Sequence, residues 1–73
     1  MRVRMNTPEL LGELLAYLAA SPNAVVEQVS ADELEVSLLG SYGEDMMRME
    51  VYLRVRAWEA GRQAAGARVE IVD

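Results

Sequence analysis

The segment from Ser41 to Gly66 constrains the fold most, because two incompatible periods run through it. Apolar side chains occupy the odd positions from Met47 to Ala57, and charged side chains take most of the even positions, which is typical of a strand with one buried face. The spacing of a capping box at Ser41–Glu44 and a glycine at position 66, suited to a left-handed C-cap, favour a helix instead. The choice between helix and strand decides the fold class.

Composition and dimensions favour the helix. Between positions 44 and 65 the common residues are Met, Arg, Glu, Leu and Ala, and only two residues are β-branched. A strand over residues 46–58 would be about 43 Å long, whereas a chain of this length has a radius of gyration of about 11 Å. A helix of about 21 residues spans roughly 32 Å and fits such a domain better. We therefore predict a helix over residues 42–65, and a strand over residues 46–58 is the alternative.

The first part of the chain predicts a strand followed by a helix. Residues 2–5 alternate charged and apolar side chains, which is the period of a strand. Thr7, Pro8 and Glu9 then form a helix start, because they combine a capping side chain, a proline suited to the first turn and an acid near the positive end of the dipole. A leucine stripe follows, so we predict a helix over residues 8–20.

Three further segments carry strand signals. Residues 24–30 are short and rich in β-branched side chains, and residues 33–39 alternate apolar and polar side chains, which together predict an antiparallel hairpin. Residues 67–72 alternate in the same way and predict a final strand.

The resulting order, βαββαβ, predicts one α+β domain over residues 1–73. This is the order of the ferredoxin-like two-layer sandwich, in which a four-stranded antiparallel sheet carries two helices on one face. With residues 46–58 as a strand, the order would be βαββββ.

One part of the chain resembles a known family. The segment Val3–Leu18, VRMNTPELLGELLAYL, and the valine-rich strand after Asn23 resemble the small bacterial domains of the ferredoxin-like and ACT-like kind. The resemblance implies the sandwich fold and a small-molecule sensor, with a ligand loop at Asn6 and Thr7. ACT domains usually have a glycine near the start of that turn, where this chain has Pro8 and Glu9.

The residue inventory excludes several kinds of site. The chain has no cysteine and no histidine, so thiolate and imidazole metal sites and a histidine general base are missing. Carboxylates such as Glu44 and Asp45 suit hard cations, but helix capping accounts for them better. We expect no catalytic residue, no metal and no cofactor. A carboxylate enzyme that uses Arg54 or Arg56 is the less favoured alternative.

Charge and hydropathy bear on partners and location. A net charge of −5 argues against a nucleic-acid surface, because phosphate binding requires a basic face. No apolar run reaches the roughly 20 residues of a membrane span, and no signal-peptide segment begins the chain. We expect neither nucleic acid nor membrane as a partner, and a cytoplasmic location.

The predicted helix over residues 42–65 is apolar on two sides of a helical wheel. One side carries Met47, Val51, Val55 and Trp58. The nearly opposite side carries Met46, Met49, Leu53, Ala57, Ala60 and Ala64. One side can pack on the sheet, and the helix over residues 8–20 can cover the other only in part.

A chain of this size buries only about 60% of its unfolded surface, so a second copy is a reasonable source of further buried area. We predict a homodimer through the second side of this helix, at Met46, Met49, Leu53, Ala57 and Ala60, or through an exposed sheet edge. The function predicted from these features is a non-enzymatic binding or regulatory module, with another protein as a further potential partner. A small-molecule sensor is the alternative.

Overall fold

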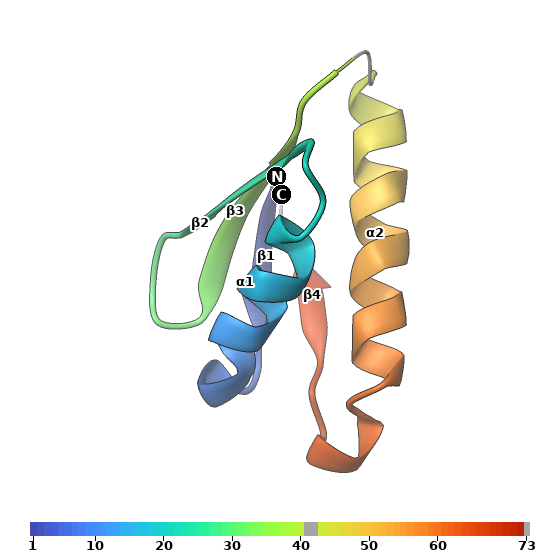
Figure 1. The fold of residues 1–73 in the computed structure, drawn as a ribbon. Coiled ribbons are helices and arrows are strands. Elements are labelled where there is room, and N and C mark those ends of the chain that lie inside the picture. Colours follow the sequence, from blue (N-terminus) through green and yellow to red (C-terminus); the bar gives the residue numbers. More distant parts are fainter. Residues whose placement is uncertain (41–42, 73) are drawn as a thin grey trace.

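A computed structural model describes residues 1–40 and 43–72 of the chain. Its elements follow the predicted order (Figure 1). They are β1 (Arg2–Met5), the 3-10 turn η1 (Pro8–Leu10), α1 (Leu11–Ala19), β2 (Ala24–Gln28), β3 (Glu33–Leu38), α2 (Glu44–Ala60), the 3-10 turn η2 (Gln63–Ala65) and β4 (Val69–Ile71).

The four strands form one antiparallel sheet in the order β2-β3-β1-β4. β1 lies inside the sheet, where Val3 faces Leu34 of β3 on one side and Ile71 of β4 on the other. β2 and β4 are the two edge strands. The predicted α+β class and the four-stranded antiparallel sheet are therefore confirmed.

The core lies between one face of the sheet and the two helices, which cover that same face (Figure 1). Val3 and Leu34 of the sheet and Leu14 of α1 are fully buried within it. The opposite face of the sheet is charged, because alternate strand residues point there. Arg4 of β1, for example, binds Glu33 of β3 through an Nη2–Oε2 ion pair of 2.8 Å.

The segment with two competing periods is a helix over Glu44–Ala60, so the alternative of a strand over residues 46–58 is wrong. Val51, Val55 and Trp58 are buried, as the helical wheel predicted, and Met47 packs against the core. The long axis of the chain measures 35 Å and its radius of gyration is 11.4 Å. A straight strand of about 43 Å would have exceeded that length.

The end of α2 differs from its prediction. The helix predicted over residues 42–65 stops at Ala60, with Gly61 as its C-cap, and the chain continues into η2. Gly66 has a φ of 71° and donates its N–H to the Gln63 carbonyl at 2.9 Å. Its left-handed conformation thus closes η2 and not α2, which has already ended with Gly61 as its C-cap.

The start of α2 was predicted from a capping box at Ser41–Glu44. Residues 41–42 lie outside the described part of the chain. Gly43 occupies the N-cap position, and no side chain from residues 1–40 or 43–72 caps the helix there, although Glu44 and Asp45 lie in the first turn. Their charge complements the positive end of the helix dipole.

The other elements have the predicted type and tighter limits. The helix predicted over residues 8–20 begins as η1 and becomes α-helical at Leu11. Thr7 precedes it at the N-cap position but makes no capping bond, and its hydroxyl donates to Asn6 Oδ1 at 3.1 Å. The three strands predicted over residues 24–30, 33–39 and 67–72 are each shorter at one or both ends, since the end residues enter loops.

Candidate interaction surface

The side of α2 that faces away from the sheet is apolar and exposed. Met46, Met49 and Leu53 keep 64%, 56% and 55% of their surface in contact with solvent, and Ala57 and Ala60 are exposed beside them. These five residues are called the outer face of α2 below. They are the five residues predicted from the sequence for an interface, and the structure gathers all of them on one side of one helix.

Along one flank of the outer face lies an ion pair within α2. The Arg54 Nε donates to a Glu50 carboxylate oxygen at 2.9 Å, one helical turn earlier. Both side chains are partly exposed, so the pair contributes little to stability, about 0.3–0.5 kcal/mol for a pair of this spacing. Its importance is that opposite charges lie next to the outer face.

The other flank holds Tyr52, Arg56 and Glu59. The Arg56 guanidinium lies 5.0 Å from the centre of the Tyr52 ring, and its Nη1 donates to Glu59 at 2.8 Å. Burial acts to lower the pKa of Arg56, but its hydrogen bond to Tyr52 and the charge of Glu59 raise that pKa overall, so the guanidinium stays charged.

This second flank also binds the edge of β4. Arg56 Nη1 donates to the Val69 carbonyl at 3.1 Å, and Glu59 accepts the Val69 N–H at 2.7 Å. An edge strand normally offers such backbone groups to another chain. Here side chains of α2 occupy them. This contact was not predicted, although the spacing of Arg56 and Glu59 was a signal that the two side chains share one side of a helix.

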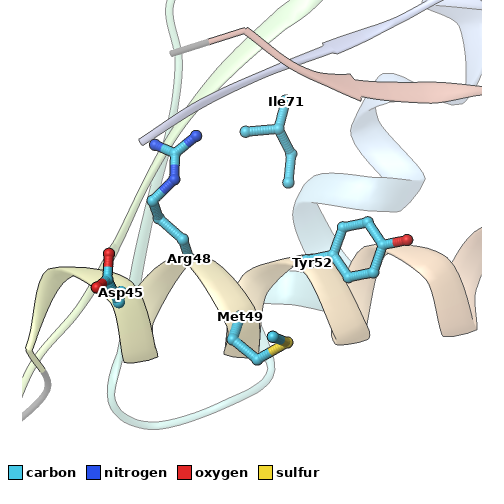
Figure 2. Close-up of a pocket in the computed structure, with 5 residues that line it drawn as sticks. All are labelled: Asp45, Arg48, Met49, Tyr52 and Ile71. Atoms are coloured by element: carbon cyan, nitrogen blue, oxygen red, sulfur yellow. The ribbon is translucent and has the colours of Figure 1, made fainter.

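A surface pocket of about 410 Å³ lies between α2 and β4 (Figure 2). Its lining residues are Asp45, Arg48, Met49, Tyr52 and Ile71. In Figure 2 the Arg48 side chain reaches from α2 toward the strands beside Ile71, while Met49 points from the other side of the helix. The pocket therefore adjoins the outer face through Met49, and its lining combines apolar side chains with one acid and one base.

The predicted ligand loop at Asn6 and Thr7 has a structural use. Asn6 Nδ2 donates to the Gly66 carbonyl at 3.1 Å, and Asn6 Oδ1 accepts the Arg68 N–H at 2.7 Å and the Thr7 hydroxyl at 3.1 Å. Asn6 thus joins the end of β1 to the segment before β4. Its amide is engaged within the chain, and neither Asn6 nor Thr7 lines the pocket beside α2.

A second, more polar pocket of about 340 Å³ lies beside the segment before β4 and is lined by Glu59, Gln63, Gly66, Ala67 and Arg68.

In residues 1–40 and 43–72, no group of three or more carboxylates is arranged to hold a metal ion. Within the same ranges, neither helix has both the length and the apolar character needed to cross a bilayer.

Comparison of the chain with protein-family models, with curated proteins and with solved structures gave no match.

Proposed function

We propose that this chain is a non-enzymatic protein-interaction module with a ferredoxin-like fold, and that it forms a homodimer through the outer face of α2. The βαββαβ order and the central position of β1 and β3 in the sheet support the fold assignment. The outer face of α2 supports the interface.

The observation that carries the proposal is the exposure of three large apolar side chains in a row on α2, each by more than half. Burying a leucine or methionine side chain fully is worth about 1.5–3 kcal/mol, so leaving Met46, Met49 and Leu53 in water forgoes a large gain. Charged side chains, Glu50 with Arg54 and Arg56 with Glu59, border the row. An apolar centre with a polar rim is the usual anatomy of a protein interface.

Other surfaces fit this role less well. The open face of the sheet carries ion pairs such as Arg4 with Glu33, and charged groups are depleted at interface centres. The β4 edge is occupied at Val69 by Arg56 and Glu59. The β2 edge, with Val25 51% exposed, is a further competitor.

Light scattering coupled to size exclusion tests the homodimer. At tens of micromolar the chain should have twice the mass of one copy, and dilution should shift it toward a single copy. A single-copy mass over the whole concentration range would overturn the proposal.

A further inference from the structure

The outer face of α2 has a symmetric spacing about Leu53. Met49 and Ala57 lie four residues before and after Leu53, and Met46 and Ala60 lie seven residues before and after it. At 3.6 residues per turn, all five positions fall within an arc of about 80° centred on Leu53. The five positions of the outer face are therefore arranged symmetrically about Leu53.

The sizes of the side chains are not symmetric. Both members before Leu53 are methionines, and both members after it are alanines. In a parallel pair of α2 helices, methionine would meet methionine at one end and alanine would meet alanine at the other. The first end would be crowded and the second would leave a gap, and both defects are destabilising in a close-packed contact. In an antiparallel pair, each methionine lies opposite an alanine of the partner, and Leu53 at the centre meets the partner's Leu53.

The charges at the flanks favour the same orientation. In an antiparallel pair with two-fold symmetry, the flank with Glu50 and Arg54 faces the same flank of the partner. In a parallel pair it faces the partner's other flank, which carries Arg56 and Glu59. Glu50 lies three residues before Leu53, and Arg54 lies one residue after it. An antiparallel partner runs in the opposite direction, so its Arg54 falls on the same side of the axis as Glu50. The two residues are then about 3 Å apart along the helix axis. Parallel pairing would instead bring Arg54 to the same axial separation from the partner's Arg56, which places like charges together.

We propose that the occupant of the outer face is a second copy of α2, packed antiparallel about a two-fold axis at Leu53, so that Met46 and Met49 contact the partner's Ala60 and Ala57. This orientation rests on the proposed homodimer through the outer face. It adds which residues meet, and it makes the interface isologous, as two-fold dimers require.

Disulfide cross-linking tests the orientation, because the chain contains no cysteine of its own. Positions 46 and 60 are separated by about 21 Å along one helix, and a disulfide requires Cα atoms within about 7 Å. Met46→Cys and Ala60→Cys are prepared separately, oxidised separately, and also mixed, equilibrated and oxidised together. The mixture should give at least tenfold more disulfide-linked dimer than either variant alone. Met49→Cys with Ala57→Cys is an equivalent second pair.

Leu53→Cys distinguishes an error in the helix orientation from an error in the interface. Position 53 lies at the two-fold axis in both the parallel and the antiparallel arrangement, so this variant should cross-link alone. If Met46→Cys and Ala60→Cys each cross-link alone as efficiently as Leu53→Cys does, the helices are parallel. The antiparallel proposal then fails while the interface stands. If the protein is dimeric but Leu53→Cys does not cross-link, the outer face is not the contact and both proposals fail.

Discussion

The Glu59 carboxylate of α2 accepts a hydrogen bond of 2.7 Å from the backbone N–H of Val69 in β4. The same oxygen, Oε2, also accepts the Arg56 guanidinium at 2.8 Å, and Arg56 in turn donates to the Val69 carbonyl at 3.1 Å. Both backbone groups of Val69 that point away from β1 are therefore bound by one helix. This relationship fixes α2 to the sheet edge and leaves the outer face of α2 on the other side.

Glu59→Ala should destabilise the chain by about 1–3 kcal/mol, because it leaves the Val69 N–H without its acceptor and removes the ion pair with Arg56. For a domain of this size each kcal/mol lowers Tm by about 4–8 °C, which calorimetry can measure. Glu59→Gln is the matched control, since it keeps an acceptor oxygen and should lose less. Equal Tm values for Glu59→Ala and the unaltered chain would show that the contact contributes nothing.

Glu35 should make stability depend on pH in the acid range. The ammonium group of Met1 lies 2.6 Å from Glu35 Oε2. Its hydrogen bond to Glu35, together with its charge, holds the Glu35 pKa below the ordinary value, although burial acts to raise that pKa. Arg2 lowers the pKa further. A depressed pKa in the folded state stabilises the fold above the unfolded pKa, about 4.3 for glutamate. That contribution is lost as the pH falls through the folded value.

Urea unfolding of the unaltered chain and of Glu35→Gln, from neutral pH down to acid pH, measures this effect. The variant should be less stable at neutral pH, and the difference between the two should shrink as the pH falls below that unfolded value. A difference that stays constant with pH would exclude the Met1–Glu35 ion pair as its source.

Asn6→Ala should loosen the attachment of β4. The Asn6 side chain accepts the Arg68 N–H at 2.7 Å and donates to the Gly66 carbonyl at 3.1 Å, and a net contribution of about 0.5–1.5 kcal/mol is usual for one such bond. Asn6→Asp keeps the acceptor and loses the donor, so its urea midpoint should fall between those of the unaltered chain and Asn6→Ala. A small molecule that raised the urea midpoint of the unaltered chain but not that of Asn6→Asp would show that Asn6 binds a ligand in addition to making its internal hydrogen bonds.

The type and order of the elements could be predicted from the sequence because each has a local cause. The leucine stripe after Pro8, the alternation at Leu34 and Val36, and the two-sided pattern of α2 all reflect side-chain periodicity. The outer face was predicted for the same reason, since a helical wheel depends only on spacing. Met46, Met49 and the other three residues are indeed exposed on one side.

What the sequence did not predict depends on contacts between distant segments. The end of α2 at Ala60 and the use of Gly66 in η2 follow from how the chain turns back toward β4. The binding of Val69 by Arg56 and Glu59 arises only once that turn has placed β4 beside α2. The role of Asn6 is similar, because its partners, Gly66 and Arg68, lie at the far end of the sequence.

The most direct test of the interface compares two leucines of nearly equal exposure. Leu53 lies on the outer face of α2 and is 55% exposed, and Leu39 follows β3 and is 57% exposed. Sedimentation velocity at tens of micromolar should show a folded monomer for Leu53→Glu and a dimer for Leu39→Glu and for the unaltered chain. A folded Leu53→Glu that still sediments as a dimer would contradict an interface on the outer face of α2.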